Sequence, residues 1–352
     1  MNRDERGVSV YLVSTGMVCS VGLSASAACA ALRAGISGLE ELPYRSKTGE
    51  PVVGAAIPSL NLDLPCATRL VEMLVLSLKD CIDKQSKYPW HNVPLLVGLA
   101  KHDRPGSGRL RDDLIAHVQQ KLGQKFHPQL SSVIATGHTA AFEGLRAARK
   151  LLQNPDLPGC LLCGVDSYIN GSSIWWLQRD GRLKTDDNSN GVIPGEAAAA
   201  VYLQRNPVPK PEALSQVIGL GFATEEATVL SDEPLLGIGL TAAARQALIE
   251  ANLEMHEIDF RLSDVTGESY GFKEQALGLA RLMRVHRDEL PIWHVAESIG
   301  DCGAAAGVCQ LVYARESFLK HYAPGDYAAC YTSAVPGARA VAVLRRVRNS
   351  ET

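Results

Sequence analysis

Three polar residues stand at positions where their side chains could do chemistry. His138 lies at the start of a predicted helix rich in glycine and alanine, directly after a short predicted strand. Asp264 lies near the end of another predicted strand, and Asp301 follows a glycine in a predicted turn. A histidine flanked by carboxylates has the composition of a general-base dyad, and such a set could also hold a divalent metal. Their chemistry therefore depends on whether the fold brings them together.

The elements that must position these residues alternate between strands and helices, which is typical of an α/β protein. Apolar runs predict strands, whereas apolar residues at helical spacing, such as Leu70, Leu74 and Leu78, predict helices. In the first half we predict strands over 8–13, 94–99, 132–135, 160–165 and 197–203. We also predict helices over 24–34, 65–84, 112–122 and 139–152, and a turn at 15–17.

A proline-rich stretch over 206–211 is the best candidate for an internal linker. Beyond it the alternation returns, with strands predicted over 217–222, 260–265, 291–295, 327–332 and 338–345. The helices of this part are predicted over 239–252, 272–284 and 302–318, with a turn over 298–301. The sequence thus predicts two halves, residues 1–205 and residues 206–352.

The two halves share one order of elements. Each has a strand, a glycine turn, a helix rich in alanine and glycine, and then two terminal strands, so that 136–148 corresponds to 300–314. Small residues at such spacing let two helices approach closely, and we expect these two helices to pack together at the centre. The alternative is a generic doubly wound α/β protein in which the similarity is accidental.

Composition excludes several classes of protein. With 352 residues, 46% of them hydrophobic and 21% charged, the chain has ordinary values for a packed globular protein and not for a disordered one. A net charge of −3 supplies no basic field for a nucleic-acid backbone. No uncharged apolar stretch reaches 18 residues, so we predict no membrane span.

The nine cysteines show no disulfide-like spacing, which favours a reducing cytoplasm, and the polar start of the chain does not look like a signal peptide. Cys160 and Cys163 form a lone CxxC pair inside a predicted buried strand. Because strand side chains alternate between faces, these two thiols are expected to point in opposite directions. Without a second cysteine pair we predict no metal site, and we predict no cofactor.

Six short segments carry glycine-rich or small-residue motifs. They are 13–22 (VSTGMVCSVG), 31–38 (ALRAGISG), 134–139 (IATGHT), 164–166 (GVD), 191–199 (GVIPGEAAA) and 300–307 (GDCGAAAG). In this order they resemble the β-ketoacyl-ACP synthase family, an acyltransferase family with the thiolase fold. The resemblance implies an α/β fold of two similar βαβαβαββ halves in a five-layer αβαβα arrangement. Two small-residue helices would pack at its centre.

The sequence departs from the family pattern at the reactive positions. The family's acyl-accepting cysteine corresponds to His138 when Thr136 anchors the alignment, and to Gly137 when the later alanines do. The family's two histidines correspond to Asp264 and Asp301.

Three further residues fall in segments where the resemblance implies substrate contacts. They are Thr266, Glu297 and Ser333, of which Glu297 lies near the position of the family's lysine. The closing glycine-rich loop of the family is replaced by 333–338.

Condensation as this family performs it is not expected from such residues. It needs a thiolate to hold the acyl chain, and an ionised aspartate repels the enolate that the reaction develops. One interpretation is a non-condensing partner, comparable to a chain-length factor. It would form a homodimer, or a heterodimer with a competent ketosynthase, and would bind acyl chains or acyl carrier protein in fatty-acid or polyketide synthesis.

Two other interpretations stay open. His138 with Asp264, Asp301 and Glu297 could serve an acyltransferase or a thioester hydrolase. Alternatively, these residues are satisfied polar groups in a retired pocket of a structural scaffold.

Four features outside this set have expected roles. Glu196 is expected to organise the core, and His294 is predicted to be a core or edge residue. Trp175 and Trp176 follow the Gly-Val-Asp segment, a region where the resemblance implies a dimer interface and an acyl tunnel. The loop over 102–109 could contact an acidic carrier protein, although a surface loop is the default.

Overall fold

The computed structural model describes residues 8–83, 88–108, 113–205 and 214–347. Within these residues, ten strands form one hydrogen-bonded sheet in the order β10-β9-β11-β12-β8-β1-β7-β6-β4-β5. The first five in this order are β10 (Ile292–His294), β9 (Phe260–Ser263), β11 (Tyr327–Ser333), β12 (Ala338–Val347) and β8 (Leu214–Thr224). The other five are β1 (Val10–Cys19), β7 (Glu196–Gln204), β6 (Cys160–Ser167), β4 (Leu95–Gly98) and β5 (Ser132–Ile134).

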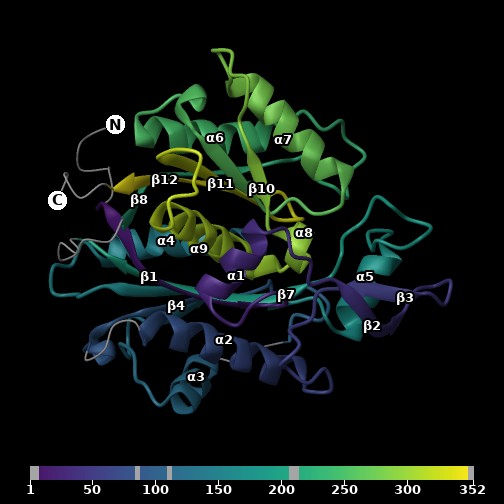
Figure 1. Ribbon diagram of the computed structural model, residues 1–352, viewed down its shortest axis with the longest axis horizontal. Coiled ribbons are helices and arrows are strands. Elements are labelled where there is room, and N and C mark those ends of the chain that lie inside the picture. The colour runs from purple at the N-terminus through teal and green to yellow at the C-terminus, as the bar shows by residue number, and fades with distance from the viewer. Residues whose placement is uncertain (1–7, 84–87, 109–112, 206–213, 348–352) are drawn as a thin grey trace.

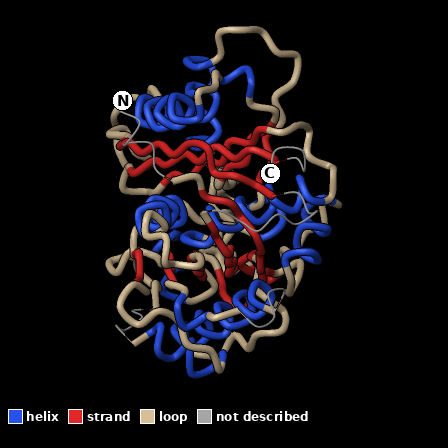
Figure 2. The backbone as a smooth tube through the Cα atoms, turned by 90° about the vertical axis from the view of Figure 1, so that its left-hand side faces the viewer, coloured by secondary structure: helices blue, strands red, loops and turns tan. Residues whose placement is uncertain are grey.

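Helices lie between, and on the outside of, two groups of strands, which are the first five and the last five in this order. Between the groups lie α1 (Ala25–Arg33), α4 (Ala140–Leu151) and α9 (Ala306–Leu319). The outer layers are α2 (Cys66–Ile82) with α3 (Leu114–Leu122) on one side, and α6 (Ile238–Ala251) with α7 (Ser269–Leu282) on the other. Figures 1 and 2 show the resulting alternation of helices and strands. The predicted five-layer, thiolase-like α/β arrangement is confirmed.

The two groups of strands join through a short antiparallel pairing of β1 with β8, in which Val10, Tyr11 and Leu12 oppose Val217, Gln216 and Ser215. Separate hydrophobic clusters fill the space on either side of the strands. Cys160 belongs to the central cluster and Cys163 to the cluster under α2 and α3, so the two thiols point to opposite faces as predicted.

The two small-residue helices meet at the centre. A Cβ atom added at Gly307 of α9 would lie 2.6 Å from the Cβ of Ala141 of α4, which is closer than van der Waals contact allows. Glycine at this position therefore permits the close approach that the pattern of small residues predicted. The turns that precede these helices consequently lie next to each other.

Several predicted boundaries are wrong. The turn expected at 15–17 lies inside β1, because Thr15, Gly16 and Met17 continue the antiparallel pairing with β7. The first two residues of the turn expected over 298–301 are the last two of a short helix, α8 (Ala296–Ile299). The helix expected from 302 is preceded by a 3-10 turn, Gly303–Ala305.

The hairpin of β2 (Glu40–Arg45) and β3 (Pro51–Gly54) has no counterpart in the predictions, and neither has helix α5 (Gly171–Arg179). The hairpin could not be predicted from a pattern of apolar residues, because β2 has the sequence EELPYR. The start of α5 is fixed by the side chain of Asn170, which accepts a hydrogen bond from the backbone N–H of Ser173 at 2.9 Å.

Some expectations fall on residues outside the described ranges. The predicted linker over 206–211 lies outside the described residues, so the division into 1–205 and 206–352 stays a prediction. The last residue of the loop over 102–109 is also outside. No helix in the described ranges combines the length and apolar character needed to cross a membrane.

Candidate functional site

His138 and Asp301 come from equivalent turns of the two halves and meet at the centre. His138 lies in the 3-10 turn Gly137–Thr139 that leads into α4, and Asp301 precedes the 3-10 turn that leads into α9. His138 Nε2 lies 3.0 Å from Asp301 Oδ1, and both side chains are buried. Gly137 has a φ of +70°, a conformation that favours glycine, and the imidazole that reaches the site is that of His138.

This contact sets the charge of both groups. Burial alone would lower the pKa of His138, but the charge and the hydrogen bond of Asp301 raise it to about 9, with further help from Asp264 and Asp166. Burial raises the pKa of Asp301, but His138 and the backbone N–H of Gly303, at 2.8 Å, lower it below its usual value. At neutral pH the two residues therefore form a buried imidazolium–carboxylate pair.

Asp264 lies just after β9 and faces the same space. Its Oδ2 accepts a hydrogen bond from the backbone N–H of Ser333 at 2.7 Å. Burial raises the pKa of Asp264 to about 7, although the positive charge of His138 and the Ser333 N–H oppose this. The two aspartates consequently differ in their readiness to carry a proton, even though they share one site.

A cavity of about 60 Å³ brings together most of the residues singled out in the sequence. It is lined by His138, Asp264, Thr266, Asp301 and Ser333. Two ion pairs that the sequence did not indicate also line it: Arg182 with Glu268, at 2.6 and 2.8 Å, and Arg339 with Glu274, at 2.7 Å.

Glu297 does not join this cluster, which corrects the expectation that it belongs to the site. It lies on α8, whose buried residues are Ala296, Ser298 and Ile299, so its own side chain turns outward and is 75% exposed. Its nearest basic partner is Nδ1 of His294, at 3.2 Å. His294 itself lies on β10, an edge strand of the sheet, as predicted.

A second cavity, of about 210 Å³, adjoins His138 from another direction. It shares His138, Ala334 and Val335 with the first cavity. Apolar side chains, including Tyr168, Trp176, Leu230, Val335 and Pro336, make up much of its lining. His138 therefore lies between a small charged cavity and a larger, mainly apolar one.

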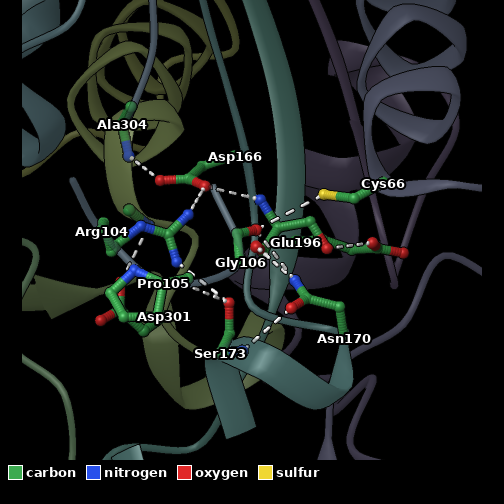
Figure 3. Close-up of polar contacts among 12 residues, drawn as sticks. Cys66, Arg104, Pro105, Gly106, Asp166, Asn170, Ser173, Glu196, Asp301 and Ala304 are labelled. Atoms are coloured by element: carbon green, nitrogen blue, oxygen red, sulfur yellow. Dashed lines mark hydrogen bonds and ion pairs between the residues drawn. The ribbon is translucent and has the colours of Figure 1, made fainter. Parts of the chain in front are cut away.

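Arg104 lines the larger cavity, and Figure 3 shows its polar contacts. Its guanidinium forms a buried ion pair with Asp166, donates to Ser173 Oγ at 3.2 Å and lies 4.2 Å from the ring centre of Tyr168. Asp166 also accepts the backbone N–H of Ala304, at 3.0 Å, in the turn that follows Asp301. The described part of the loop over 102–109 is thus joined to the turn that holds Asp301.

Glu196 has a structural role, as expected. Its side chain is fully buried, forms an ion pair with Arg69 of α2, and accepts from the backbone N–H of Ile57 at 2.9 Å and from Ser167 Oγ at 2.8 Å. The two tryptophans differ: Trp175 is 57% exposed, whereas Trp176 is buried, lines the larger cavity and stacks on Tyr168.

Among the described residues that line either cavity, none is a cysteine. The described ranges also hold no group of three or more histidine, cysteine, aspartate or glutamate side chains placed to hold a metal ion.

No protein-family profile matches the chain. Two curated proteins are similar to about half of it. Polyketide synthase PksL of Bacillus subtilis is 26% identical over 196 residues, which are 50% of this chain and 4% of PksL. The highly reducing polyketide synthase ALT1 of Alternaria alternata is 24% identical over 200 residues, 53% of this chain and 8% of ALT1. The chain thus spans less than a tenth of the length of these relatives.

Solved structures match nearly the whole chain. A chain of the AntDE:AntF complex, a type II polyketide synthase acyl-carrier protein with its ketosynthase, gives a TM-score of 0.77 at 14% identity, covering 97% of this chain and 100% of that one. The ishigamide ketosynthase/chain length factor gives 0.76 at 16% identity, covering 96% and 99%. ApeO with its chain length factor ApeC, from Xenorhabdus doucetiae, gives 0.73 at 15%, covering 99% and 100%.

These structures define the class of fold. The protein has the thiolase-like fold of ketosynthases and chain length factors, and its sequence is similar in part to polyketide synthases. At the point where the two halves meet, it carries His138 and Asp301 as a buried pair.

Proposed function

We propose that the protein is a non-condensing, ketosynthase-like subunit of polyketide-type or fatty-acid-type synthesis. It pairs with a condensing ketosynthase and contributes to the binding of the acyl chain or of its carrier protein. The observation that carries this proposal is the buried His138–Asp301 pair, at 3.0 Å, in the turn where the family's thiolate would lie.

The pair is unsuited to covalent catalysis. An imidazolium has no free lone pair on the nitrogen that carries the proton, and the pKa of about 9 keeps His138 protonated at neutral pH. Asp301, held ionised, accepts hydrogen bonds where condensation needs a donor to the developing enolate. The larger apolar cavity beside His138 nevertheless leaves space for an acyl chain.

A surface for a partner is available at one edge of the sheet. Strand β5 is a terminal strand, and within the described residues it pairs only with β4. Its Val133 side chain is 37% exposed, whereas the residues of β10, at the other end, are half-buried. Edge strands of this kind offer unpaired backbone groups to a second chain. Two of the similar solved structures contain a ketosynthase and a chain length factor, which supports pairing.

The purified protein is expected to make no β-ketoacyl product from acyl- and malonyl-carrier protein, and His138→Cys is not expected to restore synthesis. The new thiol would still face the ionised Asp301, which accepts hydrogen bonds where the reaction needs a donor. Mass spectrometry of the carrier-bound products measures this, with His117→Cys, on an exposed face of α3, as the matched control. Turnover by the wild-type protein at the rate of a condensing ketosynthase assayed in parallel would overturn the proposal.

The same assay distinguishes the proposed non-condensing subunit from an acyltransferase or thioester hydrolase that uses His138 with Asp264 and Asp301. A general base must be unprotonated, so such activity would rise toward pH 9, where His138 loses its proton. Release of free acid that rises in this way and is lost in His138→Ala would favour the enzyme, provided that His117→Ala keeps it.

Val133→Lys is expected to weaken association with a condensing ketosynthase at least tenfold, because it places a charge on an edge that must be dehydrated. Analytical ultracentrifugation of the two purified proteins measures the dissociation constant, with a ketosynthase encoded by a neighbouring gene as partner. Val53→Lys, at a 41% exposed position on β3, is the matched control. An equal loss of affinity in both variants would show that β5 is not part of the interface. Formation of a homodimer alone would contradict the proposed pairing with a ketosynthase.

A further inference from the structure

One carboxyl group in the small cavity differs from its neighbours. Four carboxyl side chains line the cavity, and within the described residues three of them have a basic partner. These pairs are Asp301 with His138, Glu268 with Arg182, and Glu274 with Arg339. Asp264 is the fourth, and it has no ion pair in the described part of the chain. Its Oδ2 accepts a hydrogen bond from the backbone N–H of Ser333.

The surroundings of Asp264 favour its neutral form. It is buried, and the charged groups that act most strongly on it are His138 from the turn before α4, Asp301 from the turn before α9, and Arg339 from β12. Arg182, Glu268 and Glu274 also line the cavity. Burial raises the pKa of Asp264 to about 7, the negative charge of Asp301 adds to this, and His138 and Arg339 oppose it. Both cations already neutralise other carboxylates, which limits their effect on Asp264.

We propose that Asp264, in its proton-bearing form, donates a hydrogen bond to the carbonyl oxygen of an uncharged acyl group in this cavity. With Oδ2 occupied by Ser333, Oδ1 is the atom left to carry the proton and make this bond. The inference rests on the proposed function, because it takes the acyl chain as the ligand, and it names the class of acyl group that the site selects.

The size and charge of the cavity define that class. A volume of about 60 Å³ holds a carbonyl and one or two methylene groups, since one water needs about 10–15 Å³ on this measure. The rest of a longer chain would extend into the larger apolar cavity, which shares His138, Ala334 and Val335 with the small one. A carboxylate on the acyl group would meet Asp301, Glu268 and Glu274, while the three cations of the lining are already paired. The cavity therefore accepts simple acyl groups and excludes malonyl-type groups.

The test measures binding of hexanoyl-N-acetylcysteamine thioester to the protein by calorimetry between pH 6 and pH 8. Wild-type affinity is expected to fall about tenfold over this range as Asp264 loses its proton. Asp264→Asn, which keeps a donor at every pH, should bind with little pH dependence, and Asp264→Ala should bind about tenfold more weakly at pH 6. Glu297→Gln, which removes an exposed carboxylate outside the cavity, is the matched control and should follow the wild-type protein.

Two further readouts keep the outcome decisive. The infrared C=O stretch of a protonated carboxyl should be present at pH 6 in the wild-type protein and missing in Asp264→Asn. Malonyl-N-acetylcysteamine thioester should show no saturable binding. Wild-type binding that is independent of pH, absence of the infrared band, absence of hexanoyl binding at pH 6, or malonyl binding as tight as hexanoyl binding would each overturn the inference. Association with a ketosynthase is measured separately, so a failure here is distinguishable from a failure of the proposed function.

Discussion

Replacing Asp301 by alanine is expected to lower the free energy of unfolding at pH 7 by about 3–5 kcal/mol. The substitution leaves the His138 imidazolium buried without its counter-charge, and it removes the acceptor for the backbone N–H of Gly303. His138 also lies in the turn that opens α4, where the helix dipole disfavours a positive charge. Asp301 offsets all of these effects, so its removal lowers the free energy of unfolding.

Urea denaturation followed by circular dichroism measures this effect, and a double-mutant cycle isolates the pair. His138→Gln combined with Asp301→Asn should recover much of the loss, because two neutral amides can hydrogen-bond without a buried charge. Glu143→Ala, which removes an exposed ion pair with Arg146 on α4, is the control and should cost less than about 1 kcal/mol. A loss under about 1 kcal/mol in Asp301→Ala would show that the pair is not ionised.

Stability is also expected to fall as the pH rises from 6.5 to 9. The pKa of His138 is about 9 in the folded protein, against 6.5 for the ordinary side chain, so the folded state holds the proton more tightly. This contribution is fully present below pH 6.5 and is lost as the pH passes the folded value. A difference of that size corresponds to about 3 kcal/mol. Asp264, with its pKa raised to about 7, acts in the same direction at lower pH.

Midpoints of urea denaturation, measured at intervals over this pH range, give the dependence of stability on pH. His138→Gln should remove most of it, whereas His117→Gln, at an exposed position on α3, should leave it unchanged. The same slope in wild-type protein and in His138→Gln would mean that His138 keeps no proton above its ordinary value.

Much of the fold could be predicted from the sequence because its elements follow simple periodic patterns. The helix over 139–152 and the strand over 160–165 were placed within a few residues of α4 and β6. Small residues such as Gly307 indicated the close central helices. The extent of β1 could not be predicted, since Thr15 and Gly16 are typical of turns and only the pairing with β7 keeps them extended.

The site was predictable only in part. His138, Asp264 and Asp301 were singled out because the resemblance aligns them with the family's reactive positions, and the structure does bring them together. Glu297 was included because the resemblance places it near the family's lysine, and a four-residue helix such as α8 gives no periodic signal to show that its side chain faces outward. Arg182 and Arg339 were missed, because a long cationic side chain that reaches a cavity has the same local sequence as one on the surface.

The distribution of thiols has a consequence for chemical labelling. Eight of the nine cysteines are buried, and Cys66, half-buried, has a pKa that burial raises to about 11. Electrophiles that alkylate thiolates therefore find few reactive sulfurs in the folded chain and none at the cavities beside His138. In a mixed complex, such a reagent would mark the catalytic cysteine of the condensing partner and leave this subunit unmodified. The ratio of label to protein would then count the active centres in the assembly.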